Sequence, residues 1–560
     1  MIEENRLRSH RFDAGLRRLT ALLIIVACCL APGRARAEDH DRDRDFQGKI
    51  HKIKNIIVVY QENWSFDSLY GLFPGANGLR NSSQTSLTQL DRLNGQPLSG
   101  ESSFNRAYTS GPSTLSIPPE ALNSSNQIDT RFPPVSLNPP PGLNTLRPYN
   151  LGTFLMPSDK TGDIVHRYWQ EQSQINGGKQ NMFVTWSDNP GLAMSYFDAT
   201  SLPEGLLAQQ YTMADNLFHS AFGGSFLNHQ FLIAAQAPVY PNAPAGLQAT
   251  LDSAGQLALN ATTGKIVHDG NVTPIGGSFF SVKGTFDKNY AVNTIFSTNL
   301  VPAGSTPGAS SLLPSLNDSN PADGTRPFTA NIGDRLDEKG VSWKWYSGGW
   351  DNALASSPSN PANNGATPAN APVDPLFQWH HQAFAYFDHF APWLPNGQRN
   401  PLSAAHLQDE HDFFLDLQNG SLPAVSFIKP LGPDNEHPGY ASLLQGQQHV
   451  ADIVHAVQNS DYWKHTLIIV TYDEHGGRWD HVAPPVVDGW GVGERVPGIL
   501  IGPLVKRHFV DHTQYETDSI LSLIENRFDV KPLGIHDAKA NPFSNSFAFG
   551  DDEGRGDDKE

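Results

Sequence analysis

The stretch TLIIVTYDEHGGRWDHVAPP, at residues 466–485, limits the possible folds more than any other part of the sequence. Its first half is a short β-branched run, typical of a strand that is buried on both faces in a parallel sheet. Asp473, Glu474 and His475 follow directly, and a Gly-Gly pair then bends the chain. Two adjacent carboxylates repel each other and lose hydration when buried, so they predict a positive charge nearby, for which a divalent cation is the simplest source. A solvated loop after a strand is the alternative.

A second stretch, KNIIVVYQENWSFDSLYG at residues 54–71, has the same order of features. Its apolar run predicts a buried strand, polar side chains follow, and a helix-start pattern comes next. In parallel α/β sheets, sites form beyond the carboxyl ends of the strands. We therefore expect oxygen ligands for a hard cation such as Mg, Ca or Mn to meet at one edge of the sheet. These ligands are Glu62, Asn63, Asp473 and Glu474.

Other apolar runs predict further strands at residues 340–346, 422–428 and 495–501, and helices at 449–458 and 517–527. The segment after residue 428 places Lys429, Asp434, Glu436 and His437 at the same edge as the paired carboxylates. Several predicted strands thus end in polar, chemically capable loops, which favours an enzyme.

Ser225 follows Gly223-Gly224 and begins an apolar helical pattern. A hydroxyl at a helix N-terminus lies among free peptide N–H groups and the positive end of the helix dipole, where phosphate binds. This position suits a nucleophile, and a plain N-cap serine is the alternative. A second helix is predicted from Asp163, in DIVHRYWQEQSQINGG, and carries His166; a structural histidine is the alternative there.

The connections are long and irregular. Residues 72–160 and about 240–372 are rich in Gly, Pro, Ser and Asn, in a chain with 49 glycines and 42 prolines. An alternating stretch around Phe279–Phe286 predicts a small β insertion. We expect residues 240–330 to form a lid or a subdomain over the site.

The first 37 residues have the pattern of a cleaved signal peptide. Arginines precede the apolar run at 19–31, and Ala35-Arg36-Ala37 forms a cleavage site, which predicts a periplasmic or secreted protein. Arg17-Arg18 suggests twin-arginine export. The alternatives are a lipoprotein attached through Cys28 and an uncleaved anchor, for which an apolar run of about 13 residues is short.

The chain has two cysteines, Cys28 and Cys29, and both lie in this segment, so its removal excludes disulfides and cysteine-based sites. The segment holds seven arginines and three acidic residues, so its removal shifts the net charge from −18 to about −22. Such an acidic chain is a poor partner for nucleic acid or for anionic membranes, and we expect no stable membrane insertion.

Six ordered motifs carry a resemblance: QENWSFDSLYG, QEQSQINGG, GGSFLNH, WHHQAFAYF, EHPG and TYDEHGGRWDHVAPP. Through them, from about Lys54 to Arg527, the chain resembles the bacterial phosphoesterase family that joins secreted acid phosphatases to phospholipases C. The resemblance implies an α/β/α sandwich like that of alkaline phosphatase, with a mainly parallel sheet. It also implies hydrolysis of phosphate esters through a phosphorylated hydroxyl side chain and one divalent metal ion, either Mg, Ca, Mn or Zn.

Carried over by motif, the resemblance implies a role for each of ten residues. The metal ligands would be Glu62, Asn63, Asp473 and Glu474, and the nucleophile Ser225. His166, His381 and His437 would act in catalysis, and Asn63, Asn228 and His380 would bind phosphate. Protonated histidines would favour mildly acidic pH, given an ordinary pKa of about 6.5.

The sequence departs from the family at two places. Trp64 stands where the family commonly has Arg, and Arg478-Trp479 stand where it often has Phe-Tyr. In many members the nucleophile is Thr rather than Ser.

We predict an acid phosphatase acting on phosphate monoesters, with a phospholipase C or another phosphodiesterase as the alternative and a non-catalytic binding protein as a remote one. Sulfatase chemistry would need a different motif at Ser225. The predicted order is a signal peptide (1–37), a flexible segment (38–53), a catalytic domain (54–545) and an acidic tail (546–560).

Overall fold

The computed structural model describes residues 46–92, 94–98, 120–135, 142–241, 243–253, 255–260, 266–274, 289–294, 330–372, 374, 376–394 and 396–549. The chain divides after Lys52 into two units. In the first, the described residues end in a 3-10 helix at Ile50–Lys52. The predicted signal peptide, Cys28 and the tail from residue 550 lie outside the described residues, as does the stretch Phe279–Phe286. Within the described ranges, no helix combines the length and the apolar character needed to cross a membrane.

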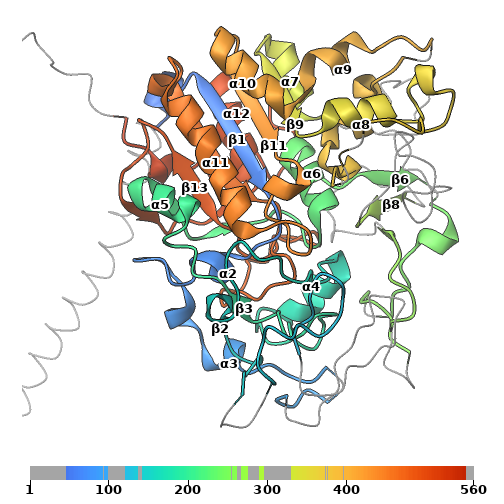
Figure 1. Cartoon of the computed structure of the whole chain (residues 1–560), viewed down its shortest axis with the longest axis vertical. Helices are drawn as coiled ribbons and strands as arrows, with labels where there is room; N and C mark the ends of the chain where they lie inside the picture. Colours follow the sequence, from blue (N-terminus) through green and yellow to red (C-terminus); the bar gives the residue numbers. More distant parts are fainter. Residues whose placement is uncertain are drawn as a thin grey trace, which may run out of the picture. The chain divides into compact units, whose positions relative to one another are not determined.

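A sheet of eight strands forms the centre of the second unit (Figure 1), in the order β10-β9-β11-β1-β12-β13-β4-β14. Neighbouring strands pair in parallel except at β13, which is antiparallel to both β12 and β4. The strands are β1 (Asn55–Gln61), β4 (Thr212–Ala214), β9 (Trp343–Ser347), β10 (Leu407–Asp409), β11 (Val425–Lys429), β12 (Thr466–Tyr472), β13 (Gly498–Ile501) and β14 (Phe509–Asp511).

The two strands expected from the sequence to be buried on both faces lie side by side at the centre of the sheet. Every residue of β1 and of β12 is buried. Val58 of β1 pairs with Phe427 of β11 on one side and Ile469 of β12 on the other. Continuous β-branched runs thus fill the middle of the sheet, as expected for parallel strands covered by helices.

Helices cover the sheet to give an α/β/α sandwich. In one group, α5 (Pro203–Gln210) packs against α11 (Leu443–Gln458), which Figure 1 shows in front of the sheet. In another, α6 (Ser225–Ala234), α7 (Ile332–Lys339) and α12 (Asp518–Phe528) pack against one another. The remaining α-helices are α2 (Phe66–Tyr70), α3 (Gln84–Leu87), α4 (Tyr168–Ile175), α8 (Trp350–Ser356), α9 (Pro401–His406) and α10 (Glu410–Asn419).

Short sheets lie in the connections. Two of them are parallel pairs. One joins β2 (Tyr149–Asn150) to β3 (Ser195–Tyr196), and the other joins β5 (Leu217–Phe218) to β15 (Tyr515–Glu516). The strands β6 (Val239–Pro241), β8 (Asn289–Val292) and β7 (Val272–Pro274) form a three-stranded antiparallel sheet. A small β insertion is therefore present in the second long connection.

Two predicted helices begin elsewhere than expected. The helix predicted from Asp163 begins at Tyr168, because the amides before it bond to side chains: Ile164 N–H donates to Asp163 and Val165 N–H to Asp188. Arg167 is an extended N-cap. His166 consequently lies on a loop and not on a helix. The helix predicted from residue 449 begins already at Leu443, where the hydroxyl of Ser442 caps it.

Candidate active site

The carboxyl ends of β1 and β12 meet and bring the two predicted motifs into contact. Asp473 N–H donates to Gln61 O at 3.0 Å, and Asn63 N–H donates to Asp473 Oδ1 at 3.1 Å. Gly476 packs so closely on this turn that an added Cβ would lie 2.2 Å from Asn63 O, at a φ of +62° that favours glycine. The four predicted metal ligands have side chains fully removed from solvent, with 0% exposure for Glu62, Asn63, Asp473 and Glu474.

Ser225 lies at the first position of α6 and faces this edge. Its Oγ donates to Glu62 Oε2 at 3.0 Å and lies 3.5 Å from Asn63 Oδ1. The N-cap is Gly224, and the Ser225 side chain makes no capping bond. The alternative of a plain N-cap serine is therefore wrong, and the hydroxyl is held by the polar groups at the end of β1.

Two predicted histidines reach Asn63 from different loops. Asn63 Nδ2 lies 3.3 Å from His166 Nε2 and 3.0 Å from His437 Nε2. His166 Nε2 is also 3.7 Å from Glu474 Oε1. On each histidine the other ring nitrogen faces a backbone carbonyl, that of Ile164 or of Pro438, so this nitrogen carries the hydrogen and the ring orientation is fixed.

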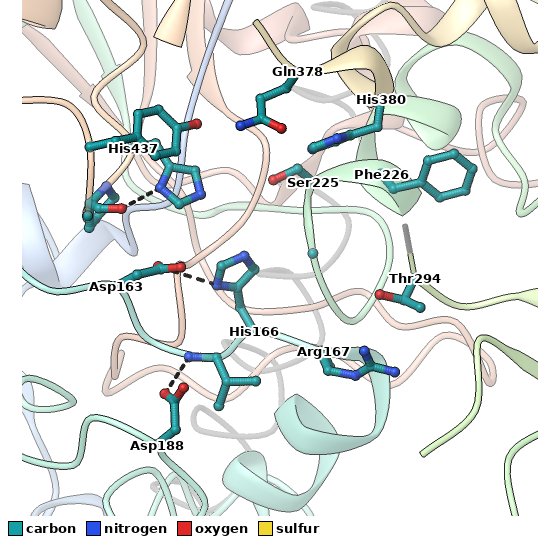
Figure 2. A pocket seen from close by; sticks show the side chains of 15 residues that line it. Asp163, His166, Arg167, Asp188, Ser225, Phe226, Thr294, Gln378, His380 and His437 are labelled. Carbon is teal, nitrogen blue, oxygen red and sulfur yellow. Dashed lines mark hydrogen bonds and ion pairs between the residues drawn. The ribbon is translucent and has the colours of Figure 1, made fainter. Parts of the chain in front are cut away.

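A cavity of about 550 Å³ opens at this edge, and Figure 2 shows Ser225, His380 and Gln378 on one side with His166 and His437 facing them. Its wall also includes Asp163, Arg167, Asp188, Phe226 and Tyr440. Arg167 is engaged, because its Nε lies 2.6 Å from Asp269 Oδ2. The cavity thus joins the Ser225 hydroxyl to imidazoles and to an acidic side formed by Asp163 and Asp188.

The adjacent histidines 380 and 381 differ in position. His380 lines the cavity, whereas His381 lies behind it with Nε2 3.1 Å from Glu62 Oε1 and its ring stacked on His229. His381 thus contacts Glu62 and does not line the cavity, and its catalytic role stays a prediction. His229, which the sequence analysis left without a role, completes a buried group with Glu62 and His381.

Asn228 does not line the cavity. Its amide donates to the carbonyls of Ala221, Gly223 and Gly224, and its Oδ1 accepts from Ala221 N–H. These bonds occupy the side chain within the turn, and the phosphate-binding role of Asn228 stays a prediction. Asn228 instead fixes the Gly-Gly turn that presents Ser225.

Lys429, at the end of β11, supplies positive charge inside the protein. It is 1% exposed, its Nζ forms an ion pair with Glu62 Oε1, and it donates to Tyr60 O at 3.1 Å. From the sequence, Lys429 was expected at this edge but without a role. The position of Lys429 at the end of an adjacent strand was the available signal.

Burial and charge together set the protonation of the site. Burial raises the pKa of Glu62, which Lys429 partly offsets, and burial with the neighbouring carboxylates raises the pKa of Asp473. Burial and the charge of Lys429 lower the pKa of His380 to about 3. Burial opposes protonation of His166, but Glu474 and Asp163 raise its pKa to about 9.

The donor set at this edge fits a hard divalent cation. Asp473 Oδ2 and Glu474 Oε1 are buried without a hydrogen-bond partner among the described residues. Buried carboxylate oxygens in this state are costly unless a cation neutralises them. Two or three carboxylates with an amide oxygen are the ligands that Mg, Ca or Mn prefers.

The two departures from the family pattern contact each other. The guanidinium of Arg478 lies over the ring of Trp64, 4.1 Å from its centroid, and both side chains are buried. Arg478 also donates to Ser195 Oγ at 2.7 Å. The two departures therefore form one buried cation–π pair.

Comparison with known proteins identifies relatives along most of the chain. The phosphoesterase family model matches residues 53–531. Phospholipase C B of Mycobacterium tuberculosis is 22% identical over 531 residues, covering 90% of this chain and 79% of that protein. Non-specific phospholipase C1 of Arabidopsis thaliana is 32% identical over 172 residues, covering 25% of this chain and 32% of that protein.

Solved structures with detectable similarity are remote. A protein of the alkaline phosphatase superfamily from Vibrio parahaemolyticus is 10% identical with a TM-score of 0.26; the match covers 60% of this chain and 63% of that one. Phosphonate monoester hydrolase SpPMH from Silicibacter pomeroyi is 11% identical with a TM-score of 0.26, covering 59% of this chain and 68% of that one.

Proposed function

This chain belongs to the phosphoesterase family and is a hydrolase of phosphoric esters, and we propose that it cleaves phospholipid-type phosphodiesters by attack of Ser225 on phosphorus. The observation that carries the proposal is the Ser225 hydroxyl at a helix N-terminus, 3.0 Å from Glu62 Oε2 and open to a cavity. Relatives named phospholipase C support the diester substrate. They favour the alternative over the acid phosphatase predicted from the sequence.

In the first step Ser225 Oγ forms a bond to phosphorus, and the bond from phosphorus to the leaving alcohol oxygen breaks. Glu62 Oε2 already accepts the hydrogen bond of this hydroxyl and is placed to receive its proton. A divalent cation held by Glu62, Asn63, Asp473 and Glu474 would supply positive charge beside Oγ and the phosphoryl oxygens. The amides at the start of α6 add to that charge.

His166 and His437 complete the step from the opposite side of the cavity. His166 lines the cavity, where its imidazole can hold a phosphoryl oxygen or, when protonated, protonate the departing alkoxide. Asn63 Nδ2 lies between the two rings and orients them. Water then attacks the phosphoserine, Ser225 recovers its proton, and a phosphomonoester leaves.

The surroundings of His166 change the pH dependence expected from the sequence. An ordinary histidine would lose its charge near pH 6.5 and favour acidic conditions. In the metal-free protein, Glu474 and Asp163 raise the pKa of His166 to about 9, so an ordinary histidine pKa does not describe this side chain.

A monoesterase is the second candidate, favoured by the position of His166 on the cavity wall. A phosphate monoester carries one more negative charge than a diester near neutral pH, and a protonated His166 would be a positive partner for it. The proposals share Ser225 and differ in the substrate that the cavity prefers.

The test compares hydrolysis of a phosphatidylcholine in mixed micelles with that of a soluble phosphomonoester, using protein that is metal-stripped and then reloaded. We expect the lipid to give the higher kcat/KM, and Ser225→Ala to lose at least about 10³-fold with both substrates. Preference for the monoester would favour the second candidate. Retained turnover in a folded Ser225→Ala variant would remove Ser225 as the nucleophile.

A further inference from the structure

A second buried group of metal-ligand side chains lies near the Ser225 turn. It consists of Glu171 on α4, His219 after β5 and His475 after β12, and each is 0% exposed. Glu171 Oε1 lies 2.9 Å from His219 Nε2 and 3.7 Å from His475 Nδ1. The two imidazoles are stacked, with ring centroids 5.5 Å apart and planes within 8°. None of these side chains lines the cavity described above.

The orientation of His219 leaves a lone pair directed at a carboxylate. Its Nδ1 lies 2.8 Å from the carbonyl of Ala221, so Nδ1 carries the hydrogen and donates it. In the neutral ring, Nε2 then holds a lone pair towards Glu171 Oε1. Nε2 forms no hydrogen bond within the described residues. A lone pair facing an anionic oxygen at 2.9 Å is repulsive unless a positive charge lies between them.

The need for a bound positive charge is greater at His475 than at His219. Neither of its ring nitrogens has a hydrogen-bond partner in the described part of the chain, although the ring is fully buried. Leaving buried polar atoms unpaired costs on the order of 1–3 kcal/mol each. A proton on His219 would satisfy the contact with Glu171 but would leave both ring nitrogens of His475 without a hydrogen bond among the described residues.

We propose that Glu171, His219 and His475 bind a structural divalent cation of the zinc type. Two imidazoles and a carboxylate are a common zinc donor set, and ligand bonds of about 2.0–2.1 Å in a tetrahedron place ligand atoms about 3.3 Å apart. The observed separations of 2.9 and 3.7 Å lie on either side of that spacing. The Nδ1–H bond of His219 to a backbone carbonyl is the outer contact that orients a metal-bound histidine.

The surroundings of the group indicate a structural rather than a catalytic role. A Cβ on Gly493 would lie 2.1 Å from His219 Cε1 and 2.5 Å from Glu171 Oε1, so backbone closes over the group. Glu171 Oε2 accepts Gly223 N–H at 2.6 Å, which ties the group to the turn before Ser225. Glu474 Oε2 lies 3.4 Å from His475 Nδ1. The cation would therefore hold both the Ser225 turn and Glu474 in place.

The first experiment counts zinc in a variant whose cavity-edge donors are removed. The full chain carrying Glu62→Gln and Asp473→Asn is stripped with chelator, reloaded with Zn²⁺, desalted and analysed by elemental mass spectrometry with zinc X-ray absorption. We expect one equivalent per chain with two imidazole ligands. A folded protein that holds no zinc, or zinc without imidazole ligands, overturns the proposal. The readout is metal content and ligand type, so failure of the proposed phosphoesterase chemistry does not affect it.

The second experiment assigns the ligands. In the same background, His219→Ala and His475→Ala are each expected to lower zinc below about 0.2 equivalents, while His449→Gln leaves it unchanged. His449 is a suitable control because it lies on α11 and pairs with Glu410 of α10, outside the proposed ligand group. Retention of the full equivalent by folded His219→Ala or His475→Ala chains contradicts the assignment. If these variants do not fold, the X-ray absorption result on the parent decides.

Discussion

Replacing Lys429 by Met removes the one cationic side chain that forms an ion pair with Glu62 Oε1 among the described residues. The ammonium is 1% exposed and the carboxylate 0%. Met keeps a similar length and apolar stem but no charge. In metal-free protein the variant must therefore keep Glu62 either charged without its cation or protonated.

The expected cost follows from burial. Removing one partner of a buried ion pair costs about 3–5 kcal/mol. For a folded unit of about 500 residues the unfolding entropy is roughly 1 kcal/mol per degree, so the thermal midpoint should fall by about 3–5 °C. Burial raises the pKa of Glu62 and Lys429 lowers it, so the substitution raises it further. A carboxyl with a raised folded-state pKa loses stability as pH rises above its unfolded value, so the deficit should be larger at pH 8 than at pH 5.

The assay is differential scanning calorimetry of chelator-treated protein at pH 5 and pH 8, beside Lys339→Met. Lys339 pairs with Asp529 on the surface, where the side chains are 44% and 98% exposed, so this control should melt close to wild type. A Lys429→Met midpoint within about 1 °C of wild type at pH 8 would refute the assignment of Lys429 as the counter-charge of Glu62.

Three further predictions concern the surroundings of the site. In metal-free protein His166, with a pKa raised to about 9, adds folding stability that is complete below about pH 6.5 and lost as pH rises through about 9. His166→Asn should reduce this loss in the free energy of unfolding, measured by urea titration at several pH values. An unchanged dependence of that free energy on pH would contradict the prediction. Burial raises the pKa of Glu204 to about 7, so the free energy of unfolding should fall as pH rises from about 4.5 to 7. Glu204→Gln should reduce that fall in the same urea titrations, and an equally steep fall in the variant would argue against this role of Glu204. In a double-mutant cycle, Trp64→Arg with Arg478→Phe should lower the free energy of unfolding by about 0.5–2 kcal/mol less than the two single changes summed, because the two side chains contact at 4.1 Å. Strictly additive changes would show that the two residues are not energetically coupled.

The strands and the polar segments that follow them could be predicted because their signals are local. Continuous β-branched runs ending in QEN and DEH indicated two buried strands with polar loops, and β1 and β12 confirm both strands. The GGSF sequence likewise indicated a helix beginning at Ser225, as α6 does. The start of α4 could not be predicted, because Asp188, distant in sequence, takes the amide of Val165.

Contacts between distant segments decided the rest. The sequence noted Trp64 and Arg478 as two separate departures, and only the fold shows that they stack. His380 and His381 are equivalent by sequence, yet one lines the cavity and the other lies behind Glu62. The sequence by itself determined the strands, the Ser225 helix start and the ligand types, since these depend on residues near in the chain. The tertiary structure decided which side chains face the cavity, which charge pairs with Glu62, and that Glu171, His219 and His475 meet. These contacts depend on how strands and loops from distant parts of the chain are placed around one edge of the sheet.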